Sequence, residues 1–185
     1  MAEQLIGKIQ TNLGFPVLHK VDAATGDVPK DLKVVGNNAV AQAGIPSVLC
    51  GFYDYLGDEE SFKKILDPAE SDRILDSLFN GRKKEFIRAV SEYAGSADDA
   101  SVQKELEHLA AESARVIEGI WKEKLSFADL KEYFGQQRHD ILSYLPSAIR
   151  IGKLLRHDNL DDSTNKMEGP LSSLMHKMEQ GFNQP

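Results

Sequence analysis

Two amphipathic helices can be read directly from one stretch of the chain, LFNGRKKEFIRAVSEYAGSADDASVQKELEHLAAESARVIEGIW, which runs from Leu78 to Trp121. Apolar residues recur there in steps of three and four, which places them on one face of a helix and the charged residues on the other. The two faces consist of Phe86, Ile87, Val90, Tyr93 and Ala94, and of Val102, Leu106, Leu109, Ser113, Val116, Ile117, Ile120 and Trp121. Burial of apolar area is worth about 25 cal/mol per Å², so this stretch predicts the hub of a helical core.

The boundary between these two helices is marked by residues that end and begin helices. Gly95 can adopt the left-handed backbone that terminates a helix. Ser96, Asp98 and Asp99 then offer side-chain oxygens to the first amides of the next helix, where negative charge also suits the helix dipole. We therefore expect a helical hairpin with a short polar turn. The basic run Gly81–Lys84 lies at the start of the first helix, where a solvated turn is favoured over a binding patch.

Upstream of the hairpin, helical spacing alternates with glycine and proline breaks. Gly44 and Pro46 are expected to separate two helices, and the second of these is apolar on nearly all sides, so it should be central. The segment Val17–Pro29 is irregular. Asp58 is expected to cap the helix that follows Gly57. The expected upstream helices are Glu3–Leu13, Asp31–Ala43, Pro46–Leu56, Asp58–Leu66 and Pro68–Phe79.

Downstream of the hairpin, Ser126 is expected to cap a helix that ends at Gly135. A further helix carries Ile141–Leu145, and another begins at Pro146 and ends near Leu155. Residues 157–169 are polar and predict a linker. Residues 170–185 predict a C-terminal amphipathic helix whose apolar stripe includes Leu174, Met175 and Met178.

Together these signals predict an all-α fold: an orthogonal array or irregular bundle of nine to eleven short helices. A single domain is expected over residues 1–156, with the 78–121 hairpin as its hub, followed by the linker and the last helix. A degenerate helical repeat is a further possibility. The segments Ile45–Leu56, Glu112–Trp121 and Leu145–Leu155 each carry an early serine and a central glycine between apolar residues. Their glycines, Gly51, Gly119 and Gly152, are expected at close helix contacts, because glycine is otherwise unfavourable inside a helix.

Composition narrows the class of protein. The 185 residues include 22 Lys and Arg against 29 Asp and Glu, a net charge of −7. This balance argues against nucleic-acid binding, which needs a basic surface. The apolar runs are too short to span a bilayer, and the N-terminus lacks the pattern of a signal peptide. We therefore expect a cytoplasmic protein.

Few residues carry a recognisable chemistry. Cys50 is the only cysteine, so an intrachain disulfide is impossible, and its apolar neighbours indicate a buried side chain rather than a nucleophile. The five histidines do not show the spacing of a helical metal motif. Phosphate-binding and nucleophile-elbow motifs are also missing. The sequence therefore predicts no catalytic residue, no cofactor and no metal.

Four pieces of the chain resemble a known family. The stretch LFNGRKKEFIRAVSEYAG, the helix end ARVIEGIW, the segment IPSVLCGFYDYL and the tail GPLSSLMHKMEQGF resemble the YidB-like bacterial family of unknown function. The resemblance covers about half of the chain in separate pieces and implies an all-helical, bacterial, cytosolic protein. Glu112, Arg115 and Glu118 stand where the family is apolar, and the glycine-rich flanks are nearly missing. The family has no established catalytic residues to carry over.

Two functions fit these observations. The first is a non-enzymatic structural or protein-interaction module that binds a protein partner or a second copy of the chain. The second is a small-molecule binder or enzyme with a pocket between helices. The candidate pocket or interaction residues are Phe52, Tyr53, Tyr55, Trp121, His139, Leu174, Met175 and Met178. Trp121 is expected to be largely buried. An apolar cavity with converging polar groups would favour the second function, and an exposed apolar patch would favour the first.

Overall fold

The computed structural model describes residues 4–123 and 126–156. These residues form eight α-helices and two short 3-10 segments, without a strand, so the all-α class is confirmed. The helices are α1 (Leu5–Leu13), α2 (Asn37–Tyr55), α3 (Glu59–Ile65), α4 (Ile74–Phe79), α5 (Lys83–Ala94), α6 (Asp99–Glu123), α7 (Phe127–Ser143) and α8 (Ile151–Leu155), with η1 (Pro68–Arg73) and η2 (Ser147–Ile149). The expected linker and C-terminal helix lie outside the described residues.

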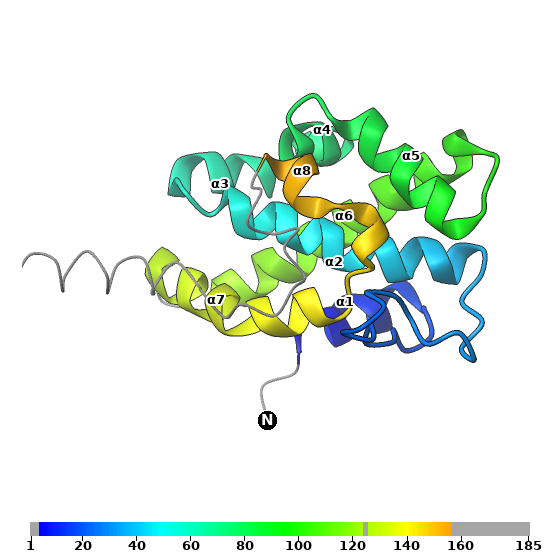
Figure 1. The fold of residues 1–185 in the computed structure, drawn as a ribbon. Helices are drawn as coiled ribbons and strands as arrows, with labels where there is room; N and C mark the ends of the chain where they lie inside the picture. Colours follow the sequence, from blue (N-terminus) through cyan, green and yellow to red (C-terminus); the bar gives the residue numbers. More distant parts are fainter. Residues whose placement is uncertain (1–3, 124–125, 157–185) are drawn as a thin grey trace, which may run out of the picture.

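Helices α2 and α6 form the centre of the molecule. They pack against each other, and α2 also contacts α1, α4, α5, α7 and α8. Figure 1 shows α3, α4, α5 and α8 on one side of this pair and α1 and α7 on the other. All residues from Ala39 to Phe52 are buried, which confirms the expectation that the helix after Pro46 is central. In the described residues, no helix is both long and apolar enough to cross a bilayer.

The expected break at Gly44–Pro46 is wrong, because α2 continues through Pro46 as one helix. Proline removes one backbone hydrogen bond and normally kinks or ends a helix. Here the surrounding backbone is buried, and a break would leave several backbone polar groups without partners away from water. The hydroxyl of Ser47 donates to the carbonyl of Ala43 at 2.6 Å in the same turn. Tertiary packing therefore overrides the local signal.

Other helix boundaries also differ from expectation. The expected Pro68–Phe79 helix is η1 followed by α4, and the helix expected from Pro146 to Leu155 is η2 followed by α8. Residues near Asp31 form a turn in which the Leu32 amide donates to the Pro29 carbonyl, and α2 begins only at Asn37. Helix α7 passes through Gly135 instead of ending there. The described residues therefore contain eight α-helices, and the expected count of nine to eleven is not confirmed: helices that the sequence separated are continuous in α2 and α7, and the expected C-terminal helix lies outside these residues.

The glycines of the proposed repeat do not share one role. A Cβ added to Gly51 would lie 3.1 Å from the Cβ of Leu78, so this glycine does allow a close helix contact. Gly119 is exposed and has no atom within 4 Å of its added Cβ, so the expectation is wrong there. A tighter helix contact than that of Gly51 occurs at Gly44, whose added Cβ would lie 2.7 Å from Leu106 Cδ2. The repeat is not confirmed.

The long connection between α1 and α2 is held in place by the buried side chain of Gln42. Its carbonyl oxygen accepts from the His19 amide at 2.9 Å. Its amide group donates to the carbonyl oxygens of His19 and Tyr144 at 2.9 and 2.8 Å. One buried side chain thus ties the irregular segment to the end of α7, and its amide is fully paired in the way a buried polar group requires.

Candidate functional site

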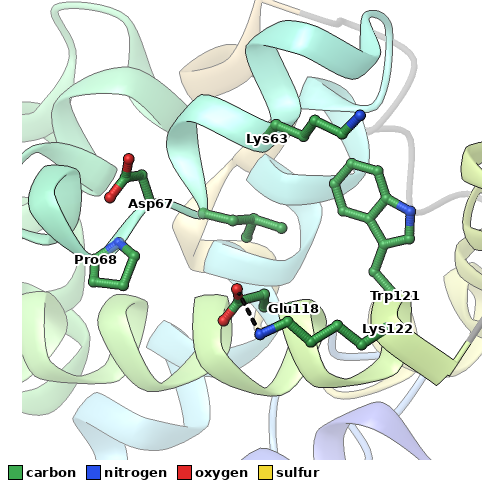
Figure 2. A pocket seen from close by; sticks show the side chains of 7 residues that line it. Lys63, Asp67, Pro68, Glu118, Trp121 and Lys122 are labelled. Atoms are coloured by element: carbon green, nitrogen blue, oxygen red, sulfur yellow. Dashed lines mark ion pairs between the residues drawn. The ribbon is translucent and has the colours of Figure 1, made fainter.

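An open hollow of about 510 Å³, called the Trp121 hollow below, lies between the end of α3 and the last turns of α6. Its lining residues are Lys63, Leu66, Asp67, Pro68, Glu118, Trp121 and Lys122. Figure 2 shows Lys63 and Lys122 on opposite sides, with the indole of Trp121 at one end and Asp67 and Pro68 at the other. The hollow therefore combines an apolar surface with a charged rim.

The apolar end of the hollow belongs to a cluster of three aromatic rings. The ring of Trp121 lies 5.7 Å from that of buried Phe62 and 5.4 Å from that of Phe127, and the last two are 5.8 Å apart. Phe52 touches Phe62 edge-on from the core side at 6.3 Å. Such tilted ring pairs stabilise beyond their buried area. Trp121 is only partly buried, because one side packs on this cluster while the indole also lines the hollow.

Local sequence signals determine the conformation of both walls of the hollow, the α3–η1 turn and the last turns of α6. Asp67 accepts a hydrogen bond from the Ala69 amide at 2.9 Å and caps η1, which begins with Pro68. This cap turns the chain directly after Leu66, which is buried. On α6, Glu118, Trp121 and Lys122 are spaced by three and four, so they share one helix face. The hollow forms where these two local faces meet.

The lysines of the rim are paired within their own helices. The Lys63 ammonium lies 2.6 Å from the Glu59 carboxylate, and the Lys122 ammonium lies 2.9 Å from Glu118. The Lys63 ammonium also sits over the Trp121 ring, 5.5 Å from its centroid. Both lysine side chains are strongly exposed, at 62% and 72%. Pairs of this kind stabilise weakly, so these side chains can move aside at little cost.

Lys83, a basic residue outside the hollow, has a structural role. Lys83, expected in a solvated turn, is only 15% exposed and bridges Asp76 at 3.2 Å and Glu107 at 2.9 Å. Partial burial works against its charge, but the hydrogen bonds and charges of both carboxylates outweigh burial and raise the pKa of Lys83. Burial likewise opposes the charge of Glu107, but the hydrogen bonds from Lys83 and Gln103 and the Lys83 charge lower its pKa. This bridge ties α4, α5 and α6 together.

Two other titratable groups are held in their neutral forms. Burial raises the pKa of the Cys50 thiol to about 12, which agrees with the expectation of a buried, unreactive side chain. Burial also raises the pKa of Tyr93, and the charge and hydrogen bond of Asp27 add to this effect. The Tyr93 hydroxyl donates to Asp27 at 3.2 Å and so anchors the α1–α2 connection to α5. Neither group lines the Trp121 hollow.

The structure does not bring the candidate residues from the sequence into one pocket. Trp121 lines the hollow, while Phe52 is fully buried beneath the aromatic cluster. Tyr53 and Tyr55 are half-buried, and Tyr55 lines a separate hollow of about 400 Å³ between α2, α4 and α8. His139 is exposed on α7 and lines neither hollow. Leu174, Met175 and Met178 lie outside the described residues.

Sequence reasoning missed six of the seven residues that line the Trp121 hollow. Each wall carries a local signal, because Lys63 and Asp67 are four residues apart and Glu118 and Lys122 are also four apart. Such spacing ordinarily indicates solvent-exposed ion pairs. Nothing in the sequence says that these two faces meet.

A second apolar surface lies on the α1–α2 connection. Val17 and Val35 are 72% and 68% exposed. Val17 and Val34 border a small hollow of about 60 Å³. Exposed apolar residues in a group can mark a contact surface, but this hollow is too small for a side chain of a partner to enter deeply.

Metal chemistry finds no support in the described residues, where no group of three or more His, Cys, Asp or Glu side chains could hold an ion. Comparisons of the chain with family models, with curated proteins and with solved structures find no match. The candidate site therefore stands on its geometry alone.

Proposed function

We propose that this protein is a non-enzymatic binding module that holds a short segment of a partner protein in the Trp121 hollow. The observation that carries the proposal is a partly buried tryptophan at an open hollow whose rim lysines are strongly exposed. Tryptophan is enriched among the residues that dominate protein–protein binding energy. An apolar centre with a polar rim is also the usual anatomy of such interfaces.

The shape of the hollow also favours a peptide. It is open to solvent between two helical walls, and Leu66, Pro68 and Trp121 provide its apolar surface. A side chain from an approaching segment can rest on this surface while its backbone stays in water. In contrast, the titratable groups with strongly raised pKa values, Cys50 and Tyr93, lie elsewhere, so the hollow offers little for acid–base chemistry.

The alternative is a small-molecule binder. A volume of about 510 Å³ lies within the range of ligand sites, about 300–1,000 Å³. The relationship to the YidB-like family, a bacterial origin, a cytoplasmic location, self-association and the lack of nucleic-acid binding also remain proposals, and they rest on the sequence alone.

The test is to select peptides from a random display library against the folded protein and to measure their binding by fluorescence anisotropy. Pro68→Trp should weaken the selected peptides at least about tenfold, because an added indole at this exposed position fills the hollow without removing a buried contact. Pro16→Trp is the matched control, since Pro16 is an exposed proline on the other apolar surface. It should leave binding unchanged.

Three results would contradict the proposal. Equal binding to both variants would mean that peptides do not use the hollow. Loss only with Pro16→Trp would move the interface to the α1–α2 connection. If no peptide is selected and a metabolite raises the melting temperature of the wild type but not of Pro68→Trp, the small-molecule alternative is favoured.

A further inference from the structure

We infer that the segment bound at the Trp121 hollow is cationic, with an arginine or lysine side chain next to an apolar one. This inference rests on the proposed function and names the chemistry of its partner. Three observations carry it: the charges that line the hollow, the charges on the neighbouring elements, and the position of a lysine over the Trp121 ring.

The first observation is an unequal pairing of the lining charges. Each lining lysine already has a glutamate within 3 Å: Lys63 is bound to Glu59 and Lys122 to Glu118. Asp67 has no cation within ion-pair distance among the described residues, and it only accepts the hydrogen bond from the Ala69 amide. Asp67 is also exposed. The lining charge that remains for a partner is therefore negative.

The second observation is the charge of the wall formed by α3 and η1. From residue 58 to residue 73 the sequence has six acidic side chains and three basic ones: Asp58, Glu59, Glu60, Asp67, Glu70 and Asp72 against Lys63, Lys64 and Arg73. Opposite charges across an interface steer the encounter and exclude partners of the wrong sign. A basic segment suits this wall, and an acidic one is repelled by it.

The third observation is that the tryptophan face already holds a cation. The Lys63 ammonium lies 5.5 Å from the centroid of the Trp121 ring, and the Lys131 ammonium lies 5.1 Å from that of neighbouring Phe127. Indole rings attract cations through the negative charge of their faces. Lys63 occupies this position from an exposed helix surface. In the bound state we expect one cation of the partner to replace Lys63 on the ring, beside Glu59, while Asp67 attracts the basic segment at the other end of the hollow.

An anionic partner is the opposite reading, since Lys63 and Lys122 could turn toward it. The two readings predict opposite effects for one substitution. If the partner is cationic, Lys63→Gln removes a competitor for the ring and a repelling charge, so binding strengthens. If the partner is anionic, the same change removes an attracting charge, so binding weakens.

The experiment titrates three peptides, (Arg-Leu-Ala)₄, (Gln-Leu-Ala)₄ and (Glu-Leu-Ala)₄, into the full chain. Trp121 is the only tryptophan, so the single indole N–H resonance in an NMR spectrum reports this site alone. The arginine peptide should shift this resonance at the lowest concentration. Lys63→Gln should tighten its binding about threefold, and Asp67→Asn should weaken it about threefold, which is typical of exposed charges.

Matched controls separate charge at the hollow from net charge. Asn can still accept the bond from the Ala69 amide, so Asp67→Asn keeps the cap and removes only the charge. Asp98→Asn makes the same change at the cap of α6, where Asp98 accepts from Ala100 and Ser101. That cap is about 35 Å from Trp121 along the helix axis, so binding should not change. Lys104→Gln, an exposed lysine on α6, is the control for Lys63→Gln.

Each outcome has one meaning. Tighter binding of the glutamate peptide, with loss on Lys63→Gln, would overturn the cationic partner and leave a peptide-binding hollow. Equal effects of Asp67→Asn and Asp98→Asn would also overturn it, because only net charge would then matter. If none of the three peptides shifts the indole resonance, the inference fails. The display selection then decides separately whether the proposed function fails with it.

Discussion

The two ends of α6 differ sharply, although one amphipathic stripe runs along the whole helix. In its N-terminal half, α6 packs closely on α2: Leu106 and Leu109 are fully buried, and Gly44 lets the two helices approach. The hydroxyl of Ser113 is buried and donates to the Leu109 carbonyl at 2.8 Å. At the C-terminal end, Gly119 is exposed and Trp121 borders an open hollow.

This difference shows that a helical stripe does not determine how completely its side chains are covered. Leu106 is fully buried and lies so close to α2 that Gly44 has no room for a Cβ, and dense packing is the normal state of a protein interior. Around Trp121, the opposite wall is a short helix followed by a 3-10 segment, and it leaves a hollow of about 510 Å³. We expect the first end to contribute stability, and the second borders the hollow that we propose as a binding site. Substitutions along α6 can test this division.

The largest effect is expected at the packed end. Leu106→Ala should lower the free energy of unfolding by about 3–5 kcal/mol, because it removes a fully buried side chain and leaves a cavity. Urea unfolding followed by circular dichroism measures the change. Lys104→Ala, at an exposed position on the same helix, should stay within about 0.5 kcal/mol of the wild type. A loss near 1 kcal/mol for Leu106→Ala would mean that this contact is loosely packed.

An intermediate effect is expected at the open end. Trp121→Ala should cost roughly 2 kcal/mol, less than the 3–5 kcal/mol typical of a fully buried tryptophan, because the ring is only partly buried against Phe62 and Phe127. The same urea unfolding applies. A loss equal to that of Leu106→Ala would show that the two ends are equally packed, and no loss would show that the aromatic cluster contributes nothing.

The smallest effect concerns the ion bridge on the packed side. Glu107→Gln should cost no more than about 1 kcal/mol at neutral pH, because the pair with Lys83 is only partly shielded from water. Glu118→Gln removes the exposed pair with Lys122 at the open end and should cost less. Unfolding free energies at neutral pH give both values, and a larger cost for Glu118→Gln would contradict the comparison.

The bridge also has a pH dependence with a defined sign. The Glu107 pKa is 4.5 when unperturbed and lower in the folded protein. Its contribution to stability is therefore complete above 4.5 and disappears as the pH falls through the lower folded value. Glu107→Gln should make the free energy of unfolding depend less on pH in this acidic range. The Lys83 pKa is raised above 10.5, so its contribution disappears only as the pH rises through that folded value. If acid lowers the stability of Glu107→Gln as much as that of the wild type, the bridge is not the source of the pH dependence.

The helical fold class and many helix ends could be predicted from the sequence, because they depend on neighbouring residues. The cap of α3 by Asp58, that of α7 by Ser126 and the left-handed Gly95 at the end of α5 all occur as predicted. Each depends on one side chain or backbone conformation within about four residues of a helix end. The burial of Cys50 followed from its apolar neighbours in the same way.

The continuity of α2 and the candidate site were decided by the tertiary structure. Pro46 predicts a break by its local chemistry, but the helices packed around α2 make continuation the better choice. Gly44 and Gly119 both lie within helices, yet only Gly44 meets a neighbour. The hollow requires Lys63 and Asp67 to face Glu118 and Trp121 across more than fifty residues of sequence. Periodicity in the sequence shows which face of a helix is apolar. Whether that face is tightly packed or borders a hollow depends on side chains that only the folded chain brings together.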